Sequence, residues 1–141
     1  MATTDTTDAT AIQQRMLDAV ARGDVRALRE LAHPDYTYTA PDGETHAGVE
    51  AGLAVAEEIH VAFPDLEIEV MRTHRPDPST SIAELRLRAT HGGPYGGLAA
   101  TGRRVEGVGC NIVEVRDGRI IAERDYWDDL SILRQLGAFP G

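Results

Sequence analysis

One main change in the spacing of apolar residues divides this chain of 141 residues, and it restricts the folds that the chain can adopt. Before about residue 63, apolar side chains recur mainly every three or four positions, which is typical of amphipathic helices. From Leu66 to Trp127 they mostly alternate with polar ones, which is typical of half-buried strands. The order predicts helices first and a sheet afterwards, which favours an α+β domain over alternating βαβ units.

The expected elements follow from these patterns and from the Gly, Pro and Asp residues between them. They are two short helices ending near 33, a strand at 36–39, a helix at 48–63, strands at about 66–74, 82–91, 103–115 and 119–127, and a helix from 128 or 129 to 137. A curved antiparallel sheet over a long helix makes a cone whose mouth can hold a ligand. We expect one such domain at 10–141 and a disordered tail at 1–9, where Thr and Asp predominate.

The composition limits the classes of partner. With 23 acidic and 14 basic residues, the formal net charge of −9 argues against nucleic acid or an anionic membrane, because both are bound through excess Lys and Arg. The single cysteine, Cys110, and the lack of a Cys/His cluster argue against a zinc site. No signal peptide or membrane-spanning run is evident, so we expect a soluble, cytoplasmic protein.

The last predicted strand carries the leading site candidate. Side chains two apart on a strand share a face, so Glu123, Asp125 and Trp127 point the same way. If that face lines the cavity, Asp125 is a carboxylate in a partly apolar pocket, an environment that tunes an acid for proton transfer. The structural alternative is a strand-end acid paired with a neighbouring Arg.

The turn before this strand determines which residue faces Asp125. A two-residue turn at 117–118 would set Cys110 opposite it. A three-residue turn with Gly118 in a bulge would set Gly109 there, with Asn111 beside it. We favour the bulge, because it places Val113, Ile121 and Trp127 on one inner face.

Under that register, Asn111 lies near Asp125 and could hold a carbonyl or enolate oxygen of a substrate. The alternative is a buried amide satisfied by the backbone.

Four further residues are candidates for the site. His91 has the apolar parity of its strand and could be a second acid/base or a substrate hydrogen bonder, or could be structural. Tyr38 could bind a substrate carbonyl if its face of the 36–39 strand points inward, which parity does not decide. Trp127 is a candidate for the cavity wall. Glu123 either couples to the neighbouring acid or pairs with an Arg.

Several short motifs in order resemble a known family. They are FPDL at 63–66, THGG at 90–93, ATGRRV at 100–105, RDGRI at 116–120 and QLG at 135–137. Together they resemble the SnoaL-like polyketide cyclases, which belong to the nuclear-transport-factor-2-like superfamily of α+β cones. The resemblance covers roughly residues 11–137.

This resemblance implies an enzyme without metal or other cofactor, which cyclises an aromatic polyketide ester by an intramolecular aldol reaction. It implies a small hydrophobic or aromatic substrate and an Asp on the last strand as acid/base, and Asp125 stands at that position. It also implies a homodimer, for which we expect the outer sheet face around Val108, Cys110 and Ile112. Two family features differ, because a first-helix Tyr is absent and Asn111 replaces a His.

Other functions of this superfamily stay open. The stretch at 124–127 also matches epoxide-hydrolase-like members, but those pair the Asp with an Arg-x-Asp where this chain reads Arg88-Ala89-Thr90. An isomerase or dehydratase using Asp125 as base, and a non-catalytic binding or scaffold protein, are further alternatives. A pocket in which Asp125 and Asn111 converge would favour an enzyme, and a cone filled by side chains would favour a scaffold.

Overall fold

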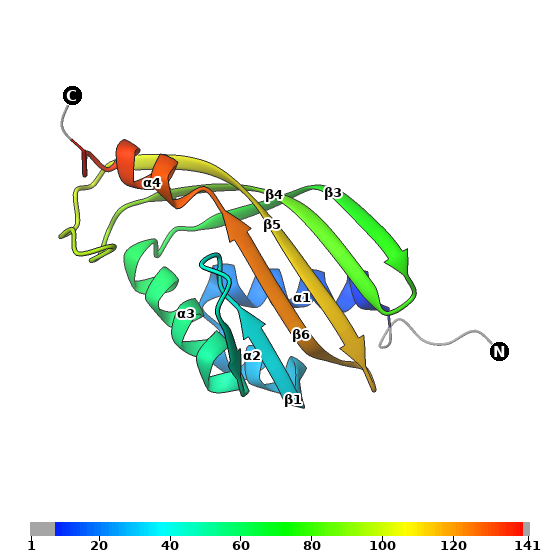
Figure 1. Cartoon of the computed structure of the whole chain (residues 1–141). Coiled ribbons are helices and arrows are strands. Elements are labelled where there is room, and N and C mark those ends of the chain that lie inside the picture. The colour runs from blue at the N-terminus through cyan, green and yellow to red at the C-terminus, as the bar shows by residue number, and fades with distance from the viewer. Residues whose placement is uncertain (1–7, 140–141) are drawn as a thin grey trace.

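A computed structural model describes residues 8–139 and shows an α+β fold in which a curved, unclosed sheet bends over helices (Figure 1). The helices are α1 (Ala9–Arg22), α2 (Val25–Leu31), α3 (Val49–Ala62) and α4 (Asp129–Gln135). The strands are β1 (Ala32–Thr39), β2 (Thr45–Ala47), β3 (Glu67–Asp77), β4 (Thr80–Thr90), β5 (Arg104–Arg116) and β6 (Arg119–Trp127). The predicted fold class is therefore confirmed.

The sheet order is β2-β1-β6-β5-β4-β3. All neighbouring strands are antiparallel except β1 and β6, which run parallel. This pairing joins the first long strand to the last one and brings two distant parts of the chain side by side. The short strand β2, which the sequence pattern did not predict, follows the turn after β1 and forms one edge of the sheet.

Helix α1 begins at Ala9, the last residue of the expected tail. Asp8 caps it, because its carboxylate accepts from the backbone N–H groups of Thr10 and Ala11 at 2.8 and 3.2 Å. Ala9, its first residue, is fully buried. The rest of the expected tail, residues 1–7, lies outside the described residues. Asp8 and Ala9, which were expected in the tail, therefore belong to the ordered start of α1.

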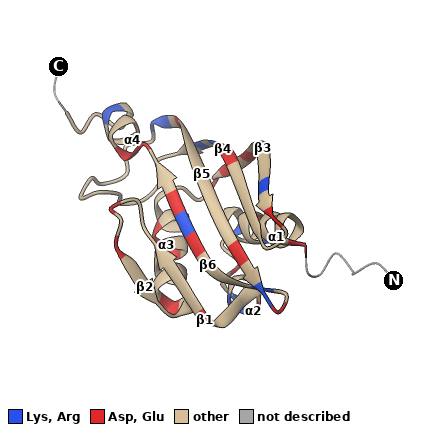
Figure 2. Cartoon of the chain, turned by 45° about the vertical axis from the view of Figure 1, so that its right-hand side comes forward, with Lys and Arg blue, Asp and Glu red and all other residues tan. Residues whose placement is uncertain are grey.

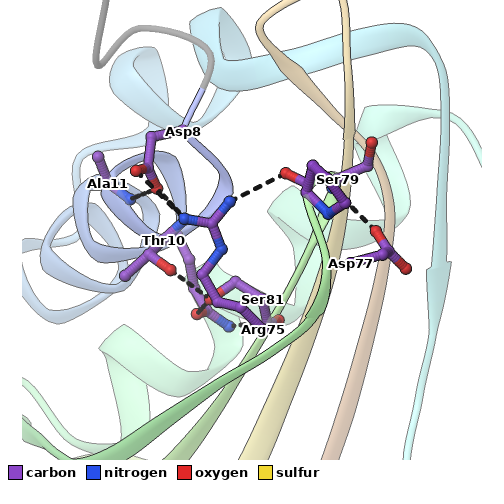
Figure 3. Close-up of polar contacts among 9 residues, drawn as sticks. Asp8, Thr10, Ala11, Arg75, Asp77, Ser79 and Ser81 are labelled. Atoms are coloured by element: carbon purple, nitrogen blue, oxygen red, sulfur yellow. Dashed lines mark hydrogen bonds and ion pairs between the residues drawn. The ribbon is translucent and has the colours of Figure 1, made fainter.

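The start of α1 is attached to the β3–β4 hairpin (Figure 3). Arg75 of β3 donates to both carboxylate oxygens of Asp8 at 3.3 Å and to the Pro78 carbonyl oxygen at 3.0 Å. The hydroxyl groups of Thr10 and Ser81 lie 3.1 Å apart. Since Arg75 and Asp8 are partly exposed, these contacts orient the helix more than they stabilise it.

The core lies between the concave face of the sheet and the helices α1 and α3, and it has two clusters of buried apolar side chains. The larger one joins α1, α2, α3, β1, β4, β5 and the start of β6, around Ile12, Leu53, Val113 and Ile120. The smaller one lies toward α4, around Phe63, Val105 and Ile132.

No helix in the described part of the chain has the length and hydropathy needed to cross a bilayer.

The β5–β6 hairpin differs from both predicted registers. Asp117 and Gly118 form a two-residue turn with φ values of 55° and 74°, as in a type I′ hairpin turn. The bulge lies in β6, where Ile121 is the extra residue between two paired positions. Asn111 therefore lies directly opposite Asp125.

This register corrects the inner-face assignment. Cys110 faces Tyr126, and Gly109 faces Trp127, so neither lies opposite Asp125. Because the extra residue interrupts the alternation, the buried isoleucine of the pair is Ile120 and not Ile121 as predicted.

Candidate active site

Two carboxyl groups on the concave face of the sheet share one amide. The Asn111 Nδ2 donates to Asp125 Oδ1 at 2.6 Å and to Glu123 Oε2 at 3.0 Å. Asn111 is 1% exposed and Glu123 is 9% exposed. Both N–H groups of this amide are used by the acids, so Asn111 positions them and has no free donor for a substrate oxygen, in contrast to the role first considered.

The tyrosines of β1 complete this group. The Tyr36 hydroxyl donates to Glu123 Oε1 at 2.7 Å, and the Tyr38 hydroxyl donates to Asp125 Oδ2 at 2.9 Å. Both side chains are buried, and the parallel pairing of β1 with β6 brings them to the acids. The tyrosine face of the strand therefore points inward, and each of the four carboxyl oxygens has one donor.

Gln13 on α1 binds the oxygen side of the Asn111 amide, and it was not among the predicted site residues. Its Nε2 donates to Asn111 Oδ1 and to the Asn111 carbonyl oxygen, both at 2.9 Å. Its Oε1 accepts from the Ser81 hydroxyl at 2.7 Å. Because Gln13 donates to Asn111 Oδ1, the NH₂ group of Asn111 must face the acids. The available signal was a glutamine in register with the apolar positions Leu17 and Val20 of the same helix.

Burial controls the protonation of these groups. It raises the pKa of Glu123 to about 8, assisted by the nearby Asp125 charge and opposed by the hydrogen bonds from Tyr36 and Asn111. Burial likewise raises the pKa of Asp125, opposed by the bonds from Asn111 and Tyr38. Burial, followed by the neighbouring carboxylates, raises the pKa of both tyrosines, so their hydroxyls stay protonated and act as donors.

Two adjoining pockets reach the acids. The smaller, of about 50 Å³, lies against β1, α2 and α3, and the larger, of about 100 Å³, extends toward α4. Glu123 and Asp125 line both pockets, and Trp127 lines the larger one, as predicted for a wall residue. The other lining side chains of the larger pocket are mostly apolar, and they include Met16, Ile59, Phe63, Leu87 and Val105. The cone is thus not completely filled by side chains.

A glycine in the middle of α3 makes room for Tyr36. A Cβ atom at Gly52 would lie 2.4 Å from the Tyr36 hydroxyl oxygen. No side chain fits there without moving this hydroxyl away from Glu123. A glycine inside an apolar helical stripe is a sequence signal for such close packing, and it was not used.

The structure does not bring His91 to this group. It lies eight residues along β4 from Ala83, the partner of Asn111, which corresponds to roughly 26 Å of strand. The side chain is fully buried, and its Nδ1 lies 3.2 Å from the Thr101 backbone N–H and 2.9 Å from the Thr101 hydroxyl oxygen. Nδ1 must carry no hydrogen to accept the bond from the Thr101 N–H. These contacts attach His91 to the loop 92–103, which is a structural role.

The charged neighbours of the acids point elsewhere. Figure 2 shows acidic and basic positions in succession along β6. Because side chains alternate between faces, Arg124 lies on the outer face, where it donates to Glu114 at 2.6 Å. Among residues 8–139, no group of three His, Cys, Asp or Glu side chains is arranged to hold a metal ion.

This cone with a buried acid pair has known relatives. Residues 10–136 match the family model of the SnoaL-like polyketide cyclases. The chain is 31% identical over 129 residues to the aklanonic acid methyl ester cyclase of Streptomyces peucetius, with 88% of this chain and 87% of that protein covered. It is 30% identical over 124 residues to the nogalonic acid methyl ester cyclase of Streptomyces nogalater, with 86% and 92% covered. The chain therefore belongs to the SnoaL-like polyketide cyclase family.

Solved structures share the fold. IdmH, a polyketide cyclase candidate from Streptomyces antibioticus, superposes with a TM-score of 0.80 at 28% identity, covering 92% of this chain and 98% of that one. An epoxide hydrolase of the LEH-like type from M. tuberculosis superposes with a TM-score of 0.72 at 21% identity, covering 96% and 93%. The second likeness shows the fold alone. In this chain Arg88 binds Glu69 and Glu106 at 3.5 and 3.4 Å, not the acid pair.

Proposed function

We propose that the protein is a cofactor-independent cyclase that closes a ring in a hydrophobic or aromatic polyketide ester by intramolecular aldol addition. Support comes from the family and from relatives whose names give methyl esters of aklanonic and nogalonic acid as their substrates. The observation that carries the proposal is Asp125, which lines both pockets and is held at 2.6 Å by Asn111. A buried acid with access to an apolar pocket suits proton transfer to and from carbon and oxygen.

In the proposed reaction, Asp125 accepts a proton from an acidic C–H group of the substrate. The resulting carbanion attacks a carbonyl carbon of the same molecule, so that a C–C bond forms and the C=O π electrons move to oxygen. Asp125 then returns its proton to this oxygen, and no net proton is gained or lost. The Tyr38 hydroxyl remains protonated and donates to Asp125 until this acid takes up the proton, after which it is able to turn and donate to the developing oxyanion.

The pockets are small for such a substrate. Ligand pockets commonly have about 300–1,000 Å³, whereas the two pockets here have about 100 and 50 Å³. We propose that the substrate enters when the loop at 92–103 separates from α4. Tyr95 of this loop lines the larger pocket and donates a hydrogen bond to Asp129 of α4, so this contact must break.

The decisive test is Asp125→Asn, assayed with a panel of aromatic polyketide methyl esters. We expect kcat/KM to fall by at least about 100-fold, because general acid/base catalysis contributes about that much or more. Asp18→Asn is a suitable control, since Asp18 is exposed on α1 and lines neither pocket. Cyclisation at an unchanged rate by the Asp125 variant would refute the proposed mechanism.

We also propose that the protein forms a homodimer through the outer face of the sheet. Val108 and Tyr126 are 57% and 46% exposed there. Cys110 lies opposite Tyr126 in the sheet, and Ile112 follows it on the same face of β5. Exposed apolar side chains in such a group favour association. Sedimentation analysis of wild-type protein and Val108→Glu tests this proposal, with a dimer expected only for the former. A wild-type monomer at micromolar concentration would contradict it.

A further inference from the structure

Glu123 has no role in the proposed reaction, yet it is buried more deeply than Asp125 and bound to the same amide. Its two oxygens accept from Tyr36 and Asn111. A carboxyl group with this much burial and two dedicated donors needs an explanation, because burying a charge is costly unless it is paired.

Among the described residues, no cation forms an ion pair with either acid, because Arg88, which also lines the larger pocket, binds Glu69 and Glu106 instead. From β1 the acids meet the neutral hydroxyls of Tyr36 and Tyr38, and from β5 they meet the amide of Asn111. The helices contribute apolar wall positions, which are Met16 and Val20 of α1 and Gly52, Leu53 and Ile59 of α3. The remaining titratable neighbours are acidic or neutral, namely Asp42 near Tyr38 and the Cys110 thiol on the other face of the sheet.

Two full negative charges on one amide, without a cation, are unfavourable in this environment. The four donors from Asn111, Tyr36 and Tyr38 compensate only part of the charge. Loading one proton onto the pair removes one charge and keeps the hydrogen bonds, because a tyrosine hydroxyl can turn and accept from a protonated carboxyl group. Like-charged carboxyl groups that share a site in this way commonly hold one proton between them.

The geometry distinguishes the two acids. Asp125 has the shorter bond to Asn111, at 2.6 Å against 3.0 Å, and it is the more exposed of the two toward the pocket. A stronger hydrogen bond and more contact with solvent both favour the ionised form. Glu123, at 9% exposure, has the weaker bond to the amide.

We propose that the pair holds a single proton near neutral pH and that this proton resides on Glu123, which leaves Asp125 ionised as the base. Glu123 then keeps Asp125 ionised, because it carries the one proton that the pair binds to avoid two buried negative charges. The role that this gives to Asp125 rests on the proposed function, whereas the location of the proton does not. The pKa of about 8 that burial gives to Glu123 agrees with this assignment.

The test is infrared difference spectroscopy of the purified protein during a pH titration, in which a protonated carboxyl group has a separate C=O band. The wild-type protein is expected to show one such band at pH 7, which disappears with a midpoint near 8. Glu123→Gln is expected to lack it. Asp125→Asn is expected to retain it with a lower midpoint, because the charge that helps to raise the pKa of Glu123 is removed. Glu57→Gln, at an exposed position of α3, is the control.

Two results would overturn the proposal. One is the absence of a protonated carboxyl band at pH 7 in the wild-type protein, which needs no variant to fold. The other is a band that persists in Glu123→Gln and is lost in Asp125→Asn, since that places the proton on Asp125. Neither result depends on turnover, so failure of the cyclase assay and failure of the proton assignment can be distinguished. Where an assay is available, Glu123→Gln is expected to shift the upper limb of the pH profile of kcat/KM.

Discussion

The two ends of the cone use buried polar groups differently. Around Asp125, each carboxyl oxygen and the Asn111 amide have a protein partner, in a chain that extends back to Gln13. Around His91, near α4, the neighbours include the ring of Phe63, and the buried Nε2 has no hydrogen-bond partner within residues 8–139. The first arrangement fixes the position and protonation of an acid. The second holds a loop and shapes an apolar wall, so burial of a titratable residue is not by itself a sign of chemistry.

Replacing one amide side chain at each end of the cone is expected to give the largest difference in the loss of stability. Asn111→Leu leaves both acids and Gln13 without a central partner, and we expect the free energy of unfolding to fall by about 2–4 kcal/mol. Gln135→Leu removes a partly exposed amide that donates to the Glu106 carbonyl oxygen at 2.8 Å near α4, and it should cost less than about 1 kcal/mol. Urea denaturation measures both values. Equal losses would contradict the contrast.

The pH dependence of stability tests the acidic end alone. The pKa of Glu123 is about 8 in the folded protein against an ordinary value of 4.5, so the folded state binds more protons than the unfolded state between these values. Stability from Glu123 is therefore present at low pH and is lost as the pH rises toward 8, by roughly 1–3 kcal/mol.

Thermal or urea unfolding between pH 5 and 9 measures this loss, and Glu123→Gln should flatten the curve. The lower limit avoids Asp8 and Asp65, whose pKa values are lowered mainly by backbone hydrogen bonds and which act in the opposite sense at more acidic pH. A wild-type stability that increases from pH 5 to 8 would rule out the expected sign.

Gly52→Ala tests how closely the helix and the acid pair are fitted. Alanine normally stabilises a helix interior by up to about 1 kcal/mol relative to glycine, but here its Cβ would meet the Tyr36 hydroxyl oxygen at 2.4 Å. We expect a net loss of about 1–2 kcal/mol, as for other overpacked sites. Adding Tyr36→Phe removes the clashing oxygen and should restore part of the stability. A single variant more stable than wild type would show that Tyr36 is free to move.

Only a small effect is expected at His91. His91→Leu removes the Nδ1 contacts to Thr101, whose polar groups can turn to water, so the loss should be about 1 kcal/mol. The pH profile of kcat/KM should keep its shape, whereas loss of a limb would return His91 to the catalytic group. Thr101→Val is the matched variant, since it removes the hydroxyl from the same contact.

Local patterns were sufficient for the fold class and for placing Asp125 on the face of β6 that lines the pockets. Asp125 stands on a stretch where polar and apolar faces are clear, and the helical stripes placed α1 and α3. The register could not be read, because Ile120 and Ile121 are both apolar and a bulge between them leaves the pattern unchanged. The parallel pairing of β1 with β6 joins distant segments and leaves no local signal, so the inward direction of Tyr36 was undetermined.

For His91 the sequence pattern indicated the correct face of its strand but not its contacts, and Gln13 and Gly52 were not predicted as site residues. The parity of His91 was read correctly, but parity carries no information on distance along a strand. Gln13 and Gly52 were exceptions within apolar helical stripes, a polar residue and a small one respectively. Both turn out to contact the acid network, which suggests that exceptions within a regular pattern are good candidates for site residues.

The bulge at Ile121 decides which residue of β5 meets Asp125. If the strand kept Ile121 but lost the bulge, the plain two-residue hairpin register would place Cys110 opposite Asp125, and the Asn111 amide would stand on the other face. Deleting Ile121 itself would leave a regular ladder in which Asn111 still faces Asp125, because Ile121 is the residue without a partner in β5. A relative with one residue fewer at this point would therefore keep the same pair in the cone, whereas a relative that pairs Ile121 regularly would not.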